Sequence, residues 1–559
     1  MPALGRRLLL GLVVLFLGGS GLVYEYCLST LATHLLGNSI EQFSLIIALM
    51  LFAMGLAGLA QRAVRDPERL AALFVWVEIG LALVGGASAL LLYVAFSALE
   101  NFRLVLYGLA MLIGFGIGLE IPLLLRLNQR YRGQLADNVG DVFSLDYLGA
   151  LLGALVWAFV LLPLFALDRI SLLLGLSNMG IAALSFFLFR REIPRGSGRI
   201  ALVAALPLAT AVLGVLAWHG PAIVVHARQY LFAQPVRLHV QSPYQDIVVT
   251  GAGGRFSLYL NGRLQFDTED EFIYHELLVH PALQALDRPP EQVLVLGGGD
   301  GLAVREVRKW PSVKRIVLVD LDPAVTGLAR TWPPLVALNE GALLDDRVQA
   351  FPGAGVSPGP DVVVDKAAER PRLALQQVRA PIAVVKLVHL DADAYLGAAV
   401  GPYDAIIADF PDPGSPELAK LFSLEFYGRL QSRLRPGGVL AIQAGSPYAN
   451  RHAFWSIADT LEAAGFAVSS LHTHVPTFGE WGWHLARVGA APAPAGDPPV
   501  PTRYLDAAVL AAAQAFPRTM QRPAEVAVST RLDPAVMRLY LAREPVEGPD
   551  RFPGRAWRW

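Results

Sequence analysis

The chain has 559 residues, of which 54% are hydrophobic and 17% are charged, and its formal net charge is −1. This composition is too apolar for an ordinary soluble protein, and it lacks the basic stripe that a nucleic-acid partner requires. The single cysteine, Cys27, excludes a disulfide framework and a thiolate metal site. The apolar excess lies almost entirely before residue 220, so we expect a membrane half followed by a soluble half.

Seven apolar runs of membrane-spanning length, about 20 residues for a helix, occur in the predicted transmembrane domain, residues 1–220. The first run follows Arg6 and Arg7, as a signal peptide would. However, it is longer than a signal peptide and six more runs follow, so we predict a membrane helix there. The predicted spans are residues 8–36, 42–60, 70–96, 103–125, 143–167, 171–189 and 200–218.

Four carboxylic acids lie within or near these spans: Glu25, Glu78, Glu120 and Asp146. Ionisable groups are costly in a bilayer and are functional candidates by default. Glu120 and Asp146 fit a structural role near the end of a span. Glu25 and Glu78 fit that role less well, so a transport or ligand-binding role for them stays open.

Residues 237–270 predict a small β-strand domain. The segments 239–250 and 255–266 are rich in Val, Tyr and Phe, and Gly253-Gly254 between them suits a hairpin turn. Acidic residues after Thr268 then favour the start of a helix.

Residues 292–323 predict a strand, a glycine-rich turn, a helix and a second strand, which is the βαβ unit of a mostly parallel sheet. A further buried strand, Ala405–Ala408, leads into "DFPDP", whose prolines exclude a helix. Ligands of such sheets bind at the carboxyl ends of the strands, so the turn and Asp409 are expected at one edge. Asp409 and Asp412 either cap their loop or hold a positive group.

The glycine-rich turn has the spacing G-x-G-x-G rather than the dinucleotide-binding G-x-G-x-x-G. Asp300 lies inside it, where an anion would repel a pyrophosphate and attract a cation. The turn therefore favours a nucleoside with a positive group over NAD, and Asp320 is placed for the ribose hydroxyls. A structural role stays open for Asp300 as a helix cap and for Asp322 as a turn acid. The glycines of the turn are Gly297, Gly299 and Gly301.

Four segments resemble signatures of the polyamine aminopropyltransferases, the spermidine and spermine synthases, in order and at comparable spacing. They are "LNGRLQFDTEDEFIYHELLVHPAL", "VLVLGGGDG", "VLVDLDP" and "IIADFPDP". The likeness covers about residues 237–487. "SPYANRHAFW" and "PTFGEWGW" resemble the membrane-attached branch of the family, which also has amino-terminal spans. The resemblance implies a Rossmann-like catalytic domain of the S-adenosylmethionine-methyltransferase type over residues 271–487.

The reaction that this resemblance implies moves the aminopropyl group of decarboxylated S-adenosylmethionine to an amine such as putrescine. The products are spermidine and methylthioadenosine, and neither a prosthetic group nor a metal is needed. An alkylamine with a pKa of about 10 is protonated at neutral pH, so a carboxylate that positions it and accepts its proton suits this chemistry.

On the donor side, the resemblance assigns contacts with the nucleoside to Gln245 and Asp300, the latter at the aminopropyl amine. Asp320 would hold the ribose, where the family more often has Glu. Asp393 in "LDADAYL" would lie near the adenine.

On the acceptor side, the resemblance makes Asp409 the catalytic acid–base residue and Asp412 the group that grips the amine. Tyr274 and His275 would lie where donor and acceptor meet. Phe478 stands where soluble members often have Tyr, so one hydroxyl contact would be missing.

The chain departs from the family near residues 352–386, where we predict an insertion made of a Pro/Gly loop and a short charged helix. A lid, a docking contact and a variable surface loop all stay open for it. Residues 488–559 predict a linker and a carboxyl-terminal appendage that packs without taking part in chemistry.

Two other functions stay open. A methyltransferase would place the carboxylate of intact S-adenosylmethionine near Asp300, which like-charge repulsion opposes. A polyamine-binding or transport protein would depend on Glu25 and Glu78, whose replacement by Gln would then abolish its function.

The predicted location is the cell (inner) membrane, as a multi-pass protein whose partners are the lipid bilayer and a diamine. Arginines in alternate loops place the amino terminus in the cytoplasm, and seven spans then place the soluble half outside. A donor made in the cytoplasm favours the cytoplasmic side instead. The resemblance also leaves a homodimer open.

Overall fold

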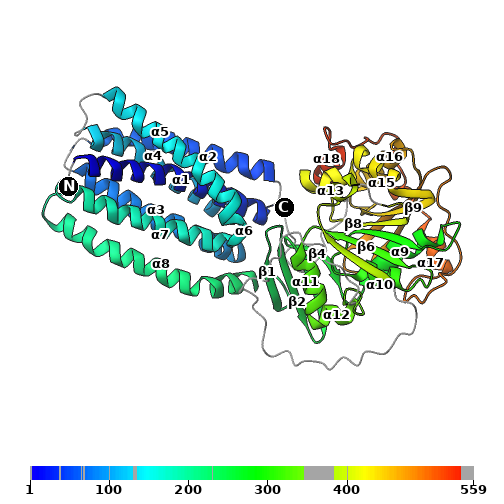
Figure 1. Ribbon diagram of the computed structural model, residues 1–559. Coiled ribbons are helices and arrows are strands. Elements are labelled where there is room, and N and C mark those ends of the chain that lie inside the picture. Colours follow the sequence, from blue (N-terminus) through cyan, green and yellow to red (C-terminus); the bar gives the residue numbers. More distant parts are fainter. Residues whose placement is uncertain are drawn as a thin grey trace. The chain divides into compact units, whose positions relative to one another are not determined.

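The computed structural model describes residues 3–36, 39–64, 66, 69–99, 101–129, 135–229, 231–344, 383–398 and 401–542. The chain divides into two compact units, a helical unit up to Val236 and an α/β unit from Arg237 (Figure 1). Most of the insertion predicted near 352–386 lies outside the described residues. Only residues 383–386 are described, and 384–386 belong to a strand.

The described part of the helical unit contains seven helices that are long and apolar enough to cross a membrane, as predicted. Six of the predicted spans lie within one helix each. The fifth helix continues through a π-helical turn, Trp157–Leu161, into the short helix α6 (Leu162–Leu164), and the predicted span 143–167 runs three residues past that end. The helices are α1 (Ala3–Leu36), α2 (Ser39–Ala60), α3 (Leu70–Ala98), α4 (Phe102–Gln129), α5 (Leu135–Val156), α7 (Leu167–Phe189) and α8 (Ser197–Gln229).

Glycines let pairs of these helices approach closely. A Cβ on Gly149 of α5 would lie 2.0 Å from the backbone oxygen of Leu15 on α1. A Cβ on Gly175 of α7 would lie 2.6 Å from the backbone oxygen of Ala82 on α3. Small residues at such crossings are typical of helix packing in apolar surroundings.

The small sheet has four antiparallel strands, β1 (Val236–Gln241), β2 (Asp246–Ala252), β3 (Arg255–Leu260) and β4 (Arg263–Asp267), in that order. The prediction of one strand in each of 239–250 and 255–266 was wrong, because each segment contains a turn. In the first, Ser242 N–H donates to the backbone oxygen of Gln245. In the second, Asn261 and Gly262 both have a positive φ.

The large sheet has seven strands in the order β10-β11-β9-β8-β5-β6-β7, of which β9, β8, β5, β6 and β7 run parallel. β11 runs antiparallel to both of its neighbours. The predicted Rossmann-like sheet is thus confirmed. Its strands are β5 (Gln292–Gly297), β6 (Arg315–Asp320), β7 (Val384–His389), β8 (Tyr403–Asp409), β9 (Leu434–Gly445), β10 (Ala467–Val475) and β11 (Gly479–Arg487).

Both faces of this sheet are buried, which explains its nearly continuous apolar strands. On β5, Val293 and Val295 belong to one hydrophobic core, and Leu294 and Leu296 belong to the other. One core includes residues of α9 (Glu271–Gln284), α10 (Leu302–Arg308), α11 (Pro323–Thr331) and α12 (Pro333–Leu338). The other includes residues of α13 (Ala392–Gly397), α15 (Leu424–Arg433), α16 (Arg451–Ala463) and α18 (Ala535–Ala542).

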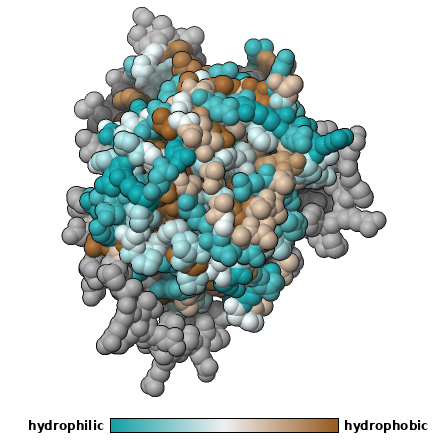
Figure 2. Space-filling model, turned by 90° about the vertical axis from the view of Figure 1, so that its right-hand side faces the viewer, coloured by the Kyte–Doolittle hydropathy of each residue, from teal (hydrophilic) through white to brown (hydrophobic). Residues whose placement is uncertain are grey.

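One face of the α/β unit has a mixed, largely hydrophilic surface. Figure 2 shows the right-hand side of Figure 1, where hydrophilic residues are mixed with small hydrophobic groups and no broad apolar band appears. By contrast, large apolar side chains such as Phe159, Leu208 and Trp218 are exposed on the helical unit.

The carboxyl-terminal tail is fixed to the α/β unit by a buried carboxylate. Glu276 of α9 is fully buried, and it accepts backbone N–H groups of Arg503, Tyr504 and Leu505 at 2.6–2.9 Å. Charge-assisted bonds of this kind are stronger than neutral ones. The tail is therefore an integral part of the unit.

Replacing Glu276 by Ala should leave these three backbone donors without their carboxylate, at a cost of about 3 kcal/mol. We expect faster limited proteolysis between residues 494 and 506 and a lower unfolding temperature. The matched control is Glu291→Ala, which changes a carboxylate whose side chain is 48% exposed. Equal protease resistance in both variants would contradict this role of Glu276.

Candidate active site

The predicted site residues meet at the carboxyl ends of β5, β6 and β8. Gly297 lies opposite Asp409 in the register of β5 and β8. A Cβ on Gly297 would lie 2.0 Å from the backbone oxygen of Asp409, and its φ of 76° also favours glycine. The first glycine of the turn thus allows the two strand ends to touch.

Asp409 is held by a phenol from α9. The hydroxyl of Tyr274 donates to Oδ1 of Asp409 at 2.6 Å. Burial raises the pKa of Tyr274 far above its usual value, so the phenol stays neutral and donates. Burial also raises the pKa of Asp409, while the charge of His275 and the Tyr274 hydrogen bond oppose that rise.

His275 is the cation of the site. Its Nδ1 lies 3.0 Å from Oε2 of Glu271, which Arg305 binds through two nitrogens at 2.8 and 2.9 Å. Burial lowers the pKa of His275, but the hydrogen bond and charge of Glu271 outweigh it and raise the pKa to about 9. The imidazole is therefore charged at neutral pH, facing the carboxylates.

Asp300 has the structural role that the sequence left open for it. Its Oδ1 accepts the backbone N–H of Leu302 at 2.8 Å, so it caps the start of α10. Its carboxylate also interacts with His275 and Asp409. Burial raises the pKa of Asp300 to about 6, against the opposing charge of His275.

Asp320 ends β6 and binds the glycine turn. It accepts the backbone N–H groups of Gly299 at 2.9 Å and Asp322 at 2.8 Å. A Cβ on Gly299 would lie 2.6 Å from Oδ2 of Asp320, so this position requires glycine. Burial raises the pKa of Asp320 to about 7, and the nearby charge of Asp322 adds to it. Gly301, with a φ of 83°, completes the turn.

Gln245 reaches this edge from the small sheet. Its side-chain amide donates to Oδ2 of Asp322 at 2.9 Å, and Ser242 Oγ donates to the same oxygen at 2.7 Å. Asp322 also caps α11 through the N–H of Ala324. Asp322 is thus the turn acid that the sequence suggested, and it also positions Gln245.

Asp412 is bound by two residues that sequence reasoning missed. Tyr540, on α18, donates its hydroxyl to Oδ2 at 2.9 Å, and the Gln443 amide lies 3.4 Å from Oδ1. The guanidinium of Arg263 lies over the Tyr540 ring, 5.7 Å from its centroid. Burial raises the pKa of Asp412, and the Tyr540 hydrogen bond opposes this. No sequence pattern marked Tyr540, because its tail was expected to carry no chemistry.

Phe478 lies at the end of the aromatic wall behind Tyr274. The centroids of these two rings are 6.2 Å apart, and Trp483 lies 5.6 Å from Tyr274 on the same wall. Phe478 also packs against Trp481 at 5.0 Å. The Phe478 side chain adds apolar surface to the site, and it has no hydroxyl group to donate.

The structure does not bring Asp393 to the other acids. Its carboxylate pairs with Arg429 at 2.8 Å and with Arg531. Asp391, two residues earlier, follows directly on β7, and the N–H of its neighbour Leu390 binds the backbone oxygen of Asp320. Asp391 therefore lies closer along the chain to the end of β7.

The chemistry of the site is that of a cation binder. The site contains four buried acids, Asp300, Asp320, Asp409 and Asp412. The His275 imidazolium acts on Asp300 and Asp409, and Arg263 acts on Asp412. Among the residues that the structure describes, no group of three or more His, Cys, Asp or Glu has a metal-binding arrangement. A positively charged organic ligand suits the remaining negative charge.

Asp300→Asn should stabilise the unliganded chain at alkaline pH. A pKa raised from 3.8 to about 6 means that the ionised form destabilises the fold above about pH 6, and that this penalty disappears as the pH falls below the unfolded value. We expect a gain of roughly 1–3 kcal/mol at alkaline pH, because one pKa unit is about 1.4 kcal/mol. Thermal unfolding at alkaline and at acidic pH measures it.

The control is Asp287→Asn, whose side chain is 82% exposed. An equal loss of stability at both pH values for Asp300→Asn would show that its capping of α10 dominates instead.

Comparison with known proteins gives the family. A model of the "Spermine/spermidine synthase domain" matches residues 271–357 and 379–493. Polyamine aminopropyltransferase 1 of Streptomyces coelicolor is 42% identical over 543 residues, which is 95% of this chain and 94% of the relative. The polyamine aminopropyltransferase of Mycobacterium tuberculosis is 40% identical over 89% of this chain and 90% of the relative.

Solved structures show a more distant likeness. A spermidine synthase in complex with the transition-state analogue AdoDATO is 23% identical, with a TM-score of 0.41, and the match covers 50% of this chain and 85% of that one. The spermidine synthase of Thermotoga maritima is 22% identical, with a TM-score of 0.39, over 50% and 84%. The curated relatives match both units of the chain, and on that evidence it belongs to the polyamine aminopropyltransferases, a family of transferase enzymes.

Proposed function

We propose that this protein is a membrane-anchored enzyme that transfers the aminopropyl group of decarboxylated S-adenosylmethionine to a diamine such as putrescine, yielding spermidine. The observation that carries the proposal is the buried pair Tyr274–Asp409, with Asp300 and Asp412 near it. Both substrates are cations, and the site offers acids for each of them.

The donor is proposed to lie along the ends of β5, β6 and β7. Asp300 would bind its amine and Asp320 its ribose hydroxyls, with Gln245 contacting it from the small sheet. We infer that Asp391 lies nearer the base than Asp393, because it is two residues closer to the end of β7. Asp391 pairs with one lysine, Lys420, at 2.8 Å, whereas Asp393 pairs with two arginines. An intact S-adenosylmethionine would bring its own carboxylate towards Asp300, which argues against a methyltransferase.

The proposed reaction needs one proton acceptor. Asp409 takes a proton from the acceptor ammonium, and the free amine then attacks the methylene beside the sulfonium. A C–N bond forms, the C–S bond breaks, and the electron pair leaves on methylthioadenosine, a neutral thioether that needs no acid. The charge of His275 and the Tyr274 hydrogen bond favour the ionised form of Asp409, and holding the reactants in line supplies much of the rate.

The acceptor is proposed to lie between Asp409 and Asp412. Tyr540 and Gln443 would orient the Asp412 carboxylate towards an ammonium group of the amine. The apolar ring of Phe478 would contact its methylene chain instead of donating a hydrogen bond.

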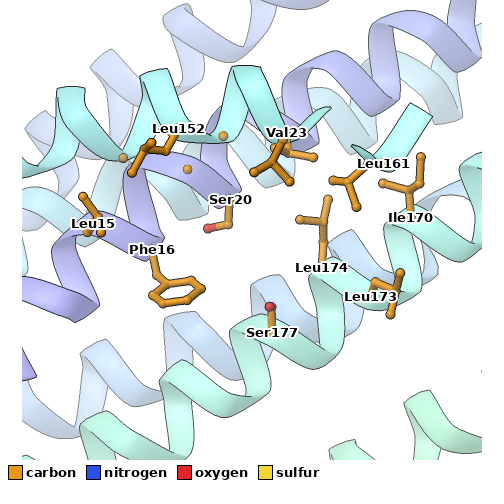
Figure 3. Close-up of a pocket in the computed structure, with 14 residues that line it drawn as sticks. Leu15, Phe16, Ser20, Val23, Leu152, Leu161, Ile170, Leu173, Leu174 and Ser177 are labelled. Atoms are coloured by element: carbon orange, nitrogen blue, oxygen red, sulfur yellow. The ribbon is translucent and has the colours of Figure 1, made fainter. Parts of the chain in front are cut away.

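The helical unit is proposed to anchor the enzyme in the membrane. Figure 3 shows a cavity of about 310 Å³ between α1, α5 and α7, with Phe16, Leu152 and Leu174 among its walls. None of the residues that line it is charged, and the hydroxyls of Ser20 and Ser177 are its polar side-chain groups. Such a cavity suits apolar chains and offers nothing to a polyamine, which argues against transport through it.

A donor made in the cytoplasm favours that side for the α/β unit. With seven crossings, the amino terminus would then lie on the opposite face. A homodimer stays a prediction from the family resemblance.

Asp409→Asn should lower kcat by about 10²- to 10⁴-fold, because the acceptor amine would lose its general base. Mass spectrometry of purified protein with decarboxylated S-adenosylmethionine and a panel of diamines measures methylthioadenosine and names the amine. Binding of the donor, followed by calorimetry, should persist in the variant. An unchanged kcat would contradict the role of Asp409, and the absence of product with any diamine would contradict the proposed reaction.

Asp393→Asn and Asp391→Asn form a matched pair of controls. The first should leave the KM for the donor within about twofold, and the second should raise it by about tenfold, the effect of 1.4 kcal/mol. The reverse result would indicate that Asp393, and not Asp391, lies near the adenine.

Tyr540→Phe should raise the KM for the amine by about three- to tenfold, because one hydrogen bond typically contributes about 1 kcal/mol. The KM for the donor should stay constant, since Tyr540 binds the acceptor-side carboxylate. Steady-state kinetics with each substrate varied in turn separate the two effects. Equal changes in both KM values would indicate a general loosening of the tail instead.

A further inference from the structure

A pair of carboxyl groups is buried in the helical unit, away from the proposed reaction. Glu78 on α3 is fully buried, and Glu120 on α4 is 2% exposed. The two side chains lie within hydrogen-bonding reach of each other. As a carboxylate, however, Glu78 receives no hydrogen bond at either oxygen. Gly116 brings the helices close at this level, since a Cβ there would lie 2.6 Å from the Leu81 side chain.

A separate polar group points to a ligand at this pair. Tyr24 on α1 is 1% exposed, and its hydroxyl has no hydrogen-bond partner. This hydroxyl interacts electrostatically with both Glu78 and Glu120. A buried hydroxyl without a partner is costly, so its persistence beside two carboxyls needs an explanation.

Asp146 on α5 connects the pair with the side of the bundle. It is partly exposed, and its charge acts on Glu120. Its Oδ1 would lie 2.8 Å from a Cβ at Gly18, so this glycine leaves room for it beside α1.

The other ionisable groups do not neutralise the pair. The groups that act on Glu78 or Glu120 in the described chain are each other, Asp146 and Tyr24, and Tyr24 is in turn affected by Cys27. No basic side chain of the described residues is among them. The other ionisable side chains of the elements packed on α3 and α4 are not among the main influences on the pair: Glu25, Tyr26 and His34 on α1, Glu41 on α2, Tyr93 on α3, Arg103, Tyr107 and Arg126 on α4, Asp141 and Tyr147 on α5, Asp168 and Arg169 on α7, and Arg199, His219 and His226 on α8.

Two ionised carboxyls in contact, without a cation, would repel each other strongly in apolar surroundings. One proton between them removes a charge and turns one carboxyl into a donor for the other. Burying ionisable groups within a membrane is costly, so such groups are functional candidates.

We propose that Glu78 and Glu120 form an exchangeable proton-binding site, with Tyr24 as its third polar group and Asp146 as its connection to the side of the bundle. The site is separate from the transferase chemistry, and it rests on the proposed membrane location of the helical unit. The pair binds one proton and releases it without unfolding.

Infrared difference spectroscopy on the full chain in lipid nanodiscs tests this site. The carbonyl band of a protonated carboxylic acid is followed from acidic to alkaline buffer, and the Glu78→Gln and Glu120→Gln spectra are subtracted from the wild type. The subtraction removes the carbonyl bands of Asp300 and Asp320, whose carboxyl groups also titrate. We expect a band of one carboxylic acid that disappears reversibly as the pH rises and is missing in either variant.

A band that persists at every pH at which the protein stays folded would show a fixed structural hydrogen bond and overturn the proposal. The absence of any difference between wild type and both variants would overturn it as well. Glu25→Gln is the matched control on α1, outside the pair, and should leave the difference spectrum unchanged.

Tyr24→Phe keeps the test valid if the Gln variants fail to fold. Removing the hydroxyl that interacts electrostatically with both carboxyls should move the midpoint of the titration, and an unmoved midpoint would exclude Tyr24 from the site. Transferase activity should be the same in wild type and Glu78→Gln. Extraction of membranes with alkaline carbonate tests the location separately, because release of the protein would contradict the anchor whatever the spectra show.

Discussion

The hydrogen bond from Tyr274 to Asp409 is the contact on which the α/β unit depends. It joins α9 to the carboxyl end of β8, at the point where Gly297 lets β5 touch the same residue. The next residues of α9 extend the connection: His275 supplies the positive charge of the site, and Glu276 holds the tail. One helix thus sets the position, charge and enclosure of the acids.

Charge balance distinguishes this edge of the sheet from the paired acids elsewhere in the α/β unit. Burial disfavours the ionised forms of Asp300, Asp320 and Asp409, and His275 offsets only part of that cost. A carboxylate cluster with too few cations is a strained arrangement that a cationic ligand relieves. Groups with perturbed pKa values therefore gather where the substrates are proposed to bind, while acids such as Asp404 are neutralised by arginines.

The sequence predicted those parts that local patterns determine. The glycine turn, the acids at strand ends and the seven apolar helices follow from short runs of residues, and the structure contains them. Contacts between distant residues had no such signal: Tyr540 lies 128 positions from Asp412, and Gln245 lies 77 from Asp322. Asp393 was placed by counting across the predicted insertion, where no register could be checked. Its neighbour Asp391 fits the end of β7 better.

Both units bury carboxyl groups, and they offset the cost of that burial in different ways. In the α/β unit, Asp320 receives two backbone N–H groups, and Asp409 receives a phenol and faces an imidazolium. Fixed donors of this kind favour the ionised form of a carboxyl group, while burial still raises the pKa of both Asp320 and Asp409. Glu78 in the helical unit receives no such donor from the described chain. Since neither backbone nor arginine compensates its charge, a mobile proton is the simplest group that can. The helical unit is therefore a candidate for chemistry of its own.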